Sequence, residues 1–408
     1  ARFSNGDPVL AEDVKYSFDT LMSKQASPTF RAYWADIARA VVVNRLTIRF
    51  EFKRRNSELH MVIGQLPVFS KAWANGRAID EVFSDPPIAS GPYVIKRVDF
   101  GKSITYERRK DYWAADLPVR KGLFNFDEVQ YQYYRDRLGE EEAVKAGDLD
   151  ALEEGSISAW VRRYKGKRFA SGELVKDEIN HRRSTGMQGL VLNLRQPRFA
   201  DIRVRSAVAL AFDFDWLNQR VFYNRRARTQ SYFQNTDDLM AGEVPTPQEL
   251  KIAQRLDQTP ALLAALRDPL VHPAETGSTA AGLRKNLVQA QRLLGEAGWT
   301  YESGALRNAA GEAFVITMLI PDRGSEIVLA PYARNLARLG IELRYRLSDA
   351  SLIKKRLDDF DFDMAINILG GSTSPGNELY DDFGSASADQ KGSQNLSGIK
   401  DKVIDQLI

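Results

Sequence analysis

The spacing of apolar residues predicts a strand followed by a helix over residues 187–223. The apolar run 190–192 is typical of a buried strand. A Pro-Arg-Phe-Ala-Asp turn at 197–201 follows, and Asp201 is placed to cap a helix because its carboxylate can accept a bond from a first-turn N–H. The apolar positions of that helix recur at helical spacing: Val204, Ala207, Val208 and Ala211. Arg203 and Arg205 are expected on its solvent side. The chain differs in character before and after this stretch, so we predict that it crosses between two lobes at 188–194.

The part before the crossing is expected to form two subdomains, an accessory one at 1–87 and the core of the first lobe at 88–188. A helix is predicted around Val14, Phe18 and Leu21, and the Asp-Pro-Pro sequence ending at Pro87 marks the boundary. The other predicted elements are a strand pair over 39–53, a hairpin over 93–107, a strand over 127–134, a helix over 140–146 and a strand over 149–152.

After the crossing, residues 189–408 are predicted to form the second lobe. Residues 235–280 are rich in Pro, Thr, Asp and Gly and are expected to be an irregular excursion over the surface. A helix is predicted over 283–298, and strands over 314–320, 341–347 and 362–369 alternate with helices over 324–339 and 349–357. This order predicts an α/β fold with a mostly parallel sheet.

The Gly-rich loop Gly370–Asn377 follows the third of these strands directly. Ligands of open α/β sheets bind beyond the carboxyl ends of strands, and glycines let a ligand approach the backbone. We therefore favour a binding role for this loop over a plain surface turn. Asn193 and Arg195, just past the crossing strand, either contact a ligand or serve the hinge.

Composition excludes several classes of function. Lys+Arg 57 and Asp+Glu 54 nearly balance, for a net charge of +3, which argues against a nucleic-acid surface. There are no cysteines, so disulfides, thiol catalysis and cysteine metal sites are excluded. Apolar runs fall short of the roughly 20 residues of a membrane span. A signal peptide is not present in this chain, and both ends read as interior sequence, so we expect a processed or truncated chain.

Motifs for catalysis or metal binding are not found. His60, His181 and His272 lie in unrelated settings without metal-ligand spacing. The pair Asp213/Asp215 and the series Asp359/Asp361/Asp363 are interpreted as solvated faces rather than as catalytic carboxylates or a calcium loop. We predict no catalytic residue, no metal and no cofactor.

Several segments together resemble the extracytoplasmic solute-binding proteins of ABC importers, in the large peptide-binding class, family 5. The N-terminal segment 3–14 is similar to the class pattern F-S-D-G-x-P-V-T-A-E-D-V. Residues 89–93 with 107–113 are similar to G-T-G-P-Y … E-R-N-x-D-Y-W, and 146–150 resembles its G-x-x-D element. Residues 192–213 are similar to the hinge pattern N-x-x-x-P-F-x-D-x-R-V-R-x-A-L-A-x-A-x-D.

Finer features, at 125–136, 211–218, 231–233 and 373–378, resemble the Yej-type subgroup, which is linked to oligopeptides and to peptide-like antibiotics such as microcin C. The resemblance implies a two-lobed fold of the periplasmic-binding-protein type II, in its large three-subdomain class, with mixed sheets and a hinge. It implies capture of oligopeptides in an interlobe cleft and delivery to the ABC transporter permease subunits. It also implies a monomer in the periplasm of a Gram-negative bacterium, with no enzymatic activity.

The predicted ligand-binding residues combine the loop with the neighbouring motifs: Asn193, Arg195, Tyr232, Leu369, Gly370, Gly371, Ser372, Thr373, Ser374, Asn377 and Asn395. In better-known oligopeptide binders the strand that ends at the cleft carries the pattern W-x-A-D-Y at the positions corresponding to 369–373, and its Asp pairs with the peptide amino terminus. Here Ser372 replaces that carboxylate, and Asp382 or Glu378 is a candidate substitute.

Two alternatives remain open at this stage. The same fold could bind an oligosaccharide. A peptide- or glycan-acting hydrolase would need paired carboxylates facing one cleft, and the sequence shows none at a convincing spacing.

Overall fold

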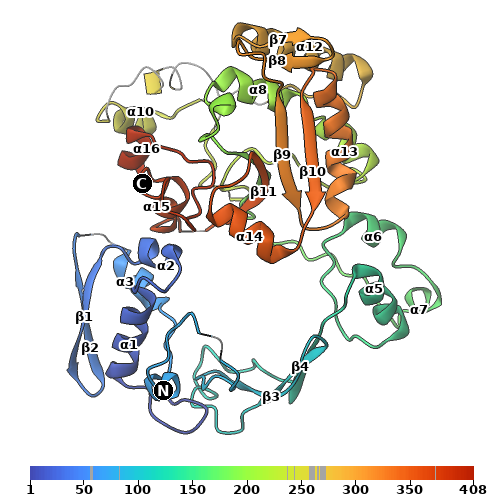
Figure 1. The fold of residues 1–408 in the computed structure, drawn as a ribbon. Coiled ribbons are helices and arrows are strands. Elements are labelled where there is room, and N and C mark those ends of the chain that lie inside the picture. The colour runs from blue at the N-terminus through green and yellow to red at the C-terminus, as the bar shows by residue number, and fades with distance from the viewer. Residues whose placement is uncertain are drawn as a thin grey trace. The chain divides into compact units, whose positions relative to one another are not determined.

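The chain folds into two compact units, residues 1–153 and residues 154–408 (Figure 1). The computed structural model describes residues 1–55, 58–81, 83–236, 238–242, 244–256, 262, 263, 266, 273–372 and 374–408. Each unit has its own buried apolar cluster. The predicted three-part division at residues 87 and 188 is a finer statement than this partition and stays a prediction.

Unit 1 holds its main core where helix α1 packs on the β1–β2 hairpin. Phe18 and Leu21 lie about one turn apart on α1 and are buried against Trp34 and Ile37. The predicted helix and strand pair are thus confirmed. The elements of unit 1 are α1 (Ala11–Leu21), α2 (Pro28–Tyr33), β1 (Ile37–Asn44), β2 (Thr47–Phe52), α3 (Leu59–Gly64), α4 (Lys71–Ala74), β3 (Tyr93–Asp99), β4 (Ser103–Arg108), β5 (Glu128–Gln132) and α5 (Arg137–Ala146).

A second sheet of unit 1 has the order β3-β4-β5 and is antiparallel throughout. It contains the predicted hairpin and the predicted strand around Val129, and both are confirmed. Helix α5 begins before its predicted start because Asp136 caps it, accepting a bond from Gly139 N at 3.0 Å. The strand predicted over 149–152 is wrong: this segment has no regular structure, and Leu152 is exposed, so the alternation there reflects no buried face.

Unit 2 is built around the strands that follow the crossing stretch. Its elements are α6 (Ile157–Arg162), α7 (Lys167–Ala170), β6 (Met187–Leu192), the 3-10 helix η1 (Pro197–Phe199), α8 (Ile202–Leu210), α9 (Phe214–Arg220), α10 (Pro247–Ala253), α12 (Ala280–Glu296), β7 (Thr300–Glu302), β8 (Ala305–Arg307), β9 (Val315–Ile320), α13 (Gly324–Ala337), β10 (Glu342–Leu347), α14 (Ala350–Asp358), β11 (Met364–Leu369), α15 (Glu378–Phe383) and α16 (Lys402–Leu407). Helix α10, capped by Thr246, lies within the stretch predicted to be irregular and corrects that prediction in part.

Strands β9 and β10 are parallel, as predicted, and α13 connects them (Figure 1). Ile316, Met318 and Ile320 alternate along β9 and are buried in the core of unit 2. Helices α8, α12 and α13 contribute to the same core. Two buried polar groups join α13 to α8: the Tyr332 hydroxyl donates to Val208 O at 2.9 Å, and Asn335 Nδ2 donates to Ala211 O at 3.0 Å.

The prediction that the third strand continues a parallel sheet is wrong. Strand β11 pairs antiparallel with β6, with a register that runs from Met364 opposite Leu192 to Leu369 opposite Met187. A side chain connects the start of β11 to β9: the carboxylate of Asp363, which directly precedes β11, accepts from the backbone N and the hydroxyl of Thr317 on β9, both at 2.8 Å. The crossing strand β6 is thus the antiparallel partner of β11, so unit 2 contains both parallel and antiparallel strand pairs.

The crossing stretch itself has the predicted strand, turn and helix. Asp201 Oδ1 accepts from Arg203 N at 2.8 Å, which confirms the cap, and the predicted apolar face of α8 is buried. Arg203 is exposed as expected. Arg205 is only half-exposed and donates to the carbonyls of Phe199 and Ala200, both at 2.8 Å, so its predicted solvent position is partly wrong. Burial lowers the pKa of Arg205.

Leu294→Ala is expected to lower the free energy of unfolding of unit 2 by about 2–5 kcal/mol, because it leaves a cavity in the core. Leu294 is 1% exposed, whereas Val288 on the same helix is 60% exposed. The control Val288→Ala should change stability by no more than about 0.5 kcal/mol. Urea denaturation followed by circular dichroism measures both, and equal losses in the two variants would contradict this description of the core.

Candidate functional site

The predicted loop lies at the carboxyl end of β11, where Leu369 pairs with Met187 at the start of β6. Gly370 and Ser374 are exposed, and Gly371 and Ser372 are half-buried. The Ser372 hydroxyl donates to Ser374 O at 2.8 Å and accepts from Ser374 N at 3.0 Å, which makes a tight turn. Thr373 lies outside the described residues. The loop therefore presents backbone groups and a hydroxyl at the end of a strand.

The glycines of this loop differ in their surroundings. A Cβ on Gly370 would meet nothing within 4 Å. A Cβ on Gly371 would lie 1.8 Å from Ser184 Oγ, and one on Gly186 would lie 2.1 Å from Leu369 O. The close approach that we expected from a ligand is therefore made at Gly371 by the chain itself, while Gly370 faces open space.

Tyr232 belongs to a segment that is hydrogen-bonded to the residues just before β6, next to the loop. Thr185 N donates to Gln234 O at 3.0 Å, which joins the residues before β6 to those after Tyr232. Tyr232 is 42% exposed as a residue, and its ring meets Phe383 of α15 edge-on, with 4.9 Å between ring centroids. Tyr232 and the loop 370–374 are thus connected through short contacts. Phe383 could not be identified from the sequence, since no spacing relates it to Tyr232.

Asn193 lies at the opposite end of the β6–β11 ladder. It follows Leu192, which pairs with Met364, and six residue steps of about 3.4 Å separate it from Met187 at the loop end, a distance of about 20 Å. Its side chain is fully buried, and Asn193 Nδ2 donates to the carbonyls of Phe360 and Phe362, both at 2.9 Å. In this structure Asn193 fastens the start of β11 to the end of β6.

Arg195 forms the centre of a network at this end of the ladder. Its guanidinium donates to Leu396 O at 2.9 Å, to Asn395 O at 3.0 Å and to Ala388 O, and also to Asn193 Oδ1 at 3.0 Å. It stacks on the Phe360 ring, 3.6 Å from its centroid. Burial lowers the pKa of Arg195. These contacts use the guanidinium for the chain's own carbonyls.

Asn395 and Asn377 are also buried. Asn395 Nδ2 donates to Gly384 O and Ile399 O, both at 3.0 Å, and Asn395 Oδ1 accepts from Ile399 N at 2.8 Å. Asn377 is 2% exposed and precedes α15. The structure thus separates the predicted residues: Tyr232, Leu369–Ser372 and Ser374 form an accessible surface, whereas Asn193, Arg195 and Asn395 form an internal network. Ligand contact by any of them stays a prediction.

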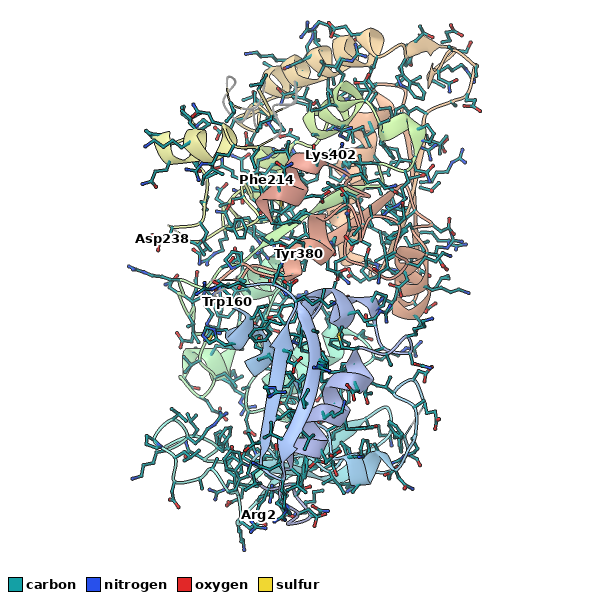
Figure 2. All side chains as sticks on the ribbon, turned by 90° about the vertical axis from the view of Figure 1, so that its left-hand side faces the viewer. Arg2, Trp160, Phe214, Asp238, Tyr380 and Lys402 are labelled. Atoms are coloured by element: carbon teal, nitrogen blue, oxygen red, sulfur yellow. The ribbon has the colours of Figure 1, made fainter. Side chains whose placement is uncertain are left out.

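Helix α15, which carries Phe383, also carries three carboxyl groups: Glu378, Asp382 and the buried Asp381. It lies beside α16, and Figure 2 labels Tyr380 and Lys402 on these two helices. Burial, together with repulsion from Asp381 and Glu378, raises the pKa of Asp382 to about 7. A cation placed against this carboxyl would stabilise its charged form.

The pair Asp213/Asp215 and the series Asp359/Asp361/Asp363 were expected on solvated faces, which is wrong for the buried Asp213 and Asp363, whereas Asp359 and Asp361 are exposed. Asp213 is buried, caps α9 and accepts from the Thr276 hydroxyl at 2.5 Å, while Asp215 accepts from Gly277 N at 2.8 Å. Asp363 is buried and pairs with Arg198. Asp359 and Asp361 form ion pairs with Lys391 and Arg356.

Among the described residues, no group of three or more His, Cys, Asp or Glu side chains could hold a metal ion. His272 lies outside them. In the same part of the chain, no helix is long and apolar enough to cross a membrane.

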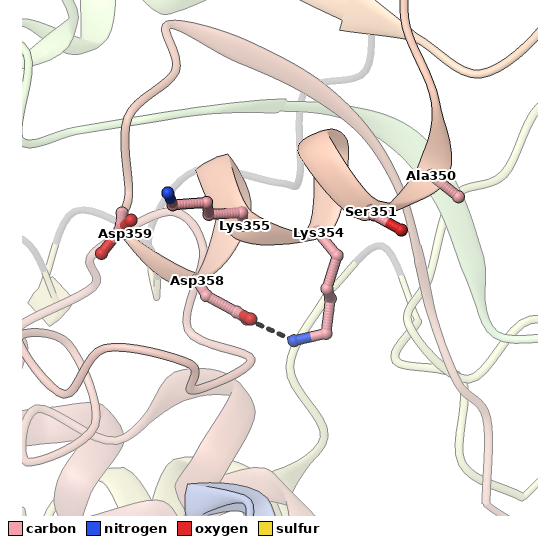
Figure 3. A pocket seen from close by; sticks show the side chains of 6 residues that line it. All are labelled: Ala350, Ser351, Lys354, Lys355, Asp358 and Asp359. Carbon is pink, nitrogen blue, oxygen red and sulfur yellow. Dashed lines mark hydrogen bonds and ion pairs between the residues drawn. The ribbon is translucent and has the colours of Figure 1, made fainter. Parts of the chain in front are cut away.

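Two hollows of unit 2 lie away from the predicted loop. One is a shallow depression along α14, where Lys354 donates to Asp358, and it is lined by the polar face of that helix (Figure 3). The other, of about 390 Å³, lies between α14 and strands β9, β10 and β11. Neither includes a predicted ligand-binding residue.

Arg195→Lys is expected to lower the free energy of unfolding by about 2–4 kcal/mol, because an ammonium cannot reach the same carbonyls and leaves buried acceptors unpaired. Arg292→Lys, in an exposed ion pair with Glu296, should change it by about 0.5 kcal/mol or less. Denaturant unfolding measures both. If Arg195→Lys leaves stability unchanged and weakens ligand binding, the structural role is contradicted.

Asp382→Asn is expected to flatten the pH dependence of stability. The folded state raises the pKa of Asp382 from 3.8 to about 7, so it binds this proton more tightly than the unfolded state does. The free energy of unfolding of the native protein should therefore fall as the pH rises from about 4 to about 7. Asp382→Asn should lose less stability than wild type over this range. The control Asp389→Asn, which removes a carboxylate paired with Lys400, should keep the wild-type slope. Unfolding midpoints at several pH values decide, and the same slope in wild type and Asp382→Asn would refute the assignment.

Comparisons with known proteins agree with this architecture. The family profile of the bacterial extracellular solute-binding proteins, family 5 middle region, matches residues 1–391. A probable peptide-binding protein YejA of Agrobacterium fabrum is 37% identical over 424 residues, which cover 100% of this chain and 67% of that protein. The chain spans about two thirds of the length of the curated relatives it matches.

Solved structures show the same fold. The oligopeptide-binding protein AppA of Bacillus subtilis, in complex with a nonapeptide, has a TM-score of 0.69 at 19% identity, covering 100% of this chain and 72% of that one. A periplasmic oligopeptide-binding protein of Thermotoga maritima with bound mannohexaose has a TM-score of 0.72 at 17% identity, covering 100% of this chain and 71% of that one. The predicted fold class, α/β of the two-lobed type II periplasmic-binding-protein kind, is confirmed. The chain belongs to the bacterial extracellular solute-binding proteins of family 5.

Proposed function

We propose that this protein is the substrate-binding component of an ABC importer and that it captures oligopeptides or peptide-like compounds. The observation that supports this most is the 37% identity, over the whole chain, to a protein named as a probable peptide-binding protein. Family membership supports a location outside the cytoplasm, and we propose the periplasm of a Gram-negative bacterium. The protein would act as a monomer, deliver its ligand to the permease subunits, use no cofactor, contact no nucleic acid and catalyse no reaction.

The accessible surface of unit 2 suits recognition of a peptide backbone. Gly370 is exposed just beyond the end of β11, and a Cβ built on it would meet nothing within 4 Å. Main-chain bonds to an extended peptide tolerate many sequences, since every peptide repeats the same donors and acceptors. Tyr232 adds an aromatic surface, and Ser372 adds a hydroxyl. We propose Tyr232 and Leu369–Ser374 as the ligand-contacting residues.

The negative charge that binds the amino terminus of the peptide would come from helix α15, because the loop offers only the neutral hydroxyl of Ser372 at that end. The resemblance to oligopeptide binders implies an aspartate at the position of Ser372, and a neutral hydroxyl bonds an ammonium more weakly than a carboxylate does. Asp382 lies on the helix that carries Phe383, the ring partner of Tyr232. A bound ammonium would offset the burial and the repulsion from neighbouring carboxylates that raise the pKa of Asp382. Glu378 is the second candidate for this role.

A second candidate function keeps the fold and replaces the peptide by an oligosaccharide. It is favoured by the likeness to the Thermotoga maritima protein with bound mannohexaose. An exposed aromatic ring such as Tyr232 would also stack on a sugar. We rank this function second because the curated relative named above, 37% identical to this chain, is described as a probable peptide-binding protein.

Calorimetry with trialanine and N-acetyl-trialanine tests the peptide proposal. Wild type should bind trialanine, and Ser372→Asp should raise the affinity ratio of the free to the acetylated peptide by about tenfold, because a carboxylate gains a charge-assisted bond to the ammonium. The matched variant Ser372→Asn has the same shape without the charge and should keep the wild-type ratio.

Equal ratios for Ser372→Asp and Ser372→Asn would show that residue 372 does not lie at the amino-terminal end of the ligand. Absence of binding of any peptide to wild type, together with binding of mannohexaose, would replace the proposed function by the second candidate.

A further inference from the structure

Two glycines interlock at the loop end of the β6–β11 ladder. Gly186 directly precedes β6 in a left-handed conformation, with φ +64°, and a Cβ on it would lie 2.1 Å from Leu369 O and 2.8 Å from Gly371 N. A Cβ on Gly371 would lie 1.8 Å from Ser184 Oγ and 2.6 Å from Gly186 N. Real Cβ atoms essentially never approach within 3.0 Å. Neither position can carry a side chain unless its neighbours move.

Residues 181–185 are fastened in turn to the segment that carries Tyr232. Thr185 N donates to Gln234 O at 3.0 Å. Asn235 Nδ2 donates to the carbonyls of His181 and Arg183, at 3.0 and 2.8 Å. A displacement of the 184–186 segment would therefore move residues 232–235 with it.

The contacts close into a ring. Tyr232 meets Phe383 with 4.9 Å between ring centroids, and α15, which carries Phe383, begins directly after the 370–377 loop. Starting from Gly371, contacts lead to Ser184, through Thr185 to Gln234, to Tyr232 and Phe383, and back along the chain to the loop. Both ends of the loop are thereby held by one set of contacts.

We propose that Gly186 and Gly371 are positioning residues for the candidate site. Their missing side chains let the 184–186 segment lie directly against the loop, which fixes Ser372 and Tyr232 in one arrangement. The effect on ligand affinity rests on the proposed function, whereas the effect on the loop does not. Dense contacts of this kind do not relax freely, so an added carbon displaces backbone.

The test compares Gly371→Ala with Gly189→Ala in the intact protein. Gly189 lies on β6 in the same ladder, and a Cβ on it would make only an ordinary contact, 3.9 Å from Met187 Cε. Gly371→Ala should weaken trialanine binding by about tenfold, while Gly189→Ala should change it by less than about twofold. Hydrogen–deuterium exchange without ligand should rise in 181–186, 230–236 and 369–372 together for Gly371→Ala only.

Relief of the clash distinguishes positioning from general destabilisation. In Gly371→Ala, the added carbon would meet Oγ and Cβ of Ser184, at 1.8 and 2.6 Å. Adding Ser184→Gly removes both atoms. The double variant should recover part of the lost affinity and of the lost exchange protection, while its melting temperature stays that of Gly371→Ala. A similar rise of exchange throughout unit 2 would assign Gly371 a purely structural role and overturn the proposal.

Unchanged exchange and affinity in Gly371→Ala would overturn it as well. If wild type binds no peptide, the proposed function fails by itself, and the exchange pattern still decides whether these glycines hold the loop.

Discussion

The structure of unit 2 depends on the contacts of one guanidinium group. Arg195 leaves the end of β6 and donates to carbonyl groups that lie 193 to 201 positions later in the chain. Asn193 adds bonds to the carbonyls of Phe360 and Phe362, next to the start of β11. Because buried carbonyls need donors, this network fixes the C-terminal segment against the β6–β11 pair.

The two ends of the β6–β11 ladder differ in structure and in proposed role. At one end, buried side chains and ordinary backbone bonds set the pairing register. At the other end, the strands release a loop with exposed backbone, an exposed tyrosine and a nearby group of carboxyl groups. An antiparallel pair transmits position well, since each residue of β11 is placed by its partner on β6. The end of the ladder that carries Asn193 and Arg195 thus determines where the accessible surface at the other end lies.

Local features of unit 2 could be predicted from the sequence. The cap at Asp201, the buried face of α8 and the parallel pair β9–β10 with its helix follow from short-range patterns. The partner of β11 could not be predicted, because β6 lies far earlier in the chain and an apolar run does not encode its partner. Arg195 was expected at the ligand for a similar reason: its carbonyl partners carry no signature in their side chains.

The candidate site was predictable in part. The position of the loop after β11 follows from its glycines and from its place at a strand end. Which residues lie against these glycines does not follow from the sequence. Ser184 and Gly186 fill the space beside Gly371, and only the fold brings these segments together. The pairing of Tyr232 with Phe383 likewise joins distant residues, so the composition of α15 alone did not reveal a connection to the loop.

The central claim is that this family 5 protein binds peptides, and native mass spectrometry of the intact protein tests it most directly. The protein would be isolated from its host without denaturation, so that a bound ligand is retained. The account predicts a heterogeneous set of bound species whose fragmentation yields amino-acid residue masses. A single defined sugar, with no peptide recovered, would contradict it.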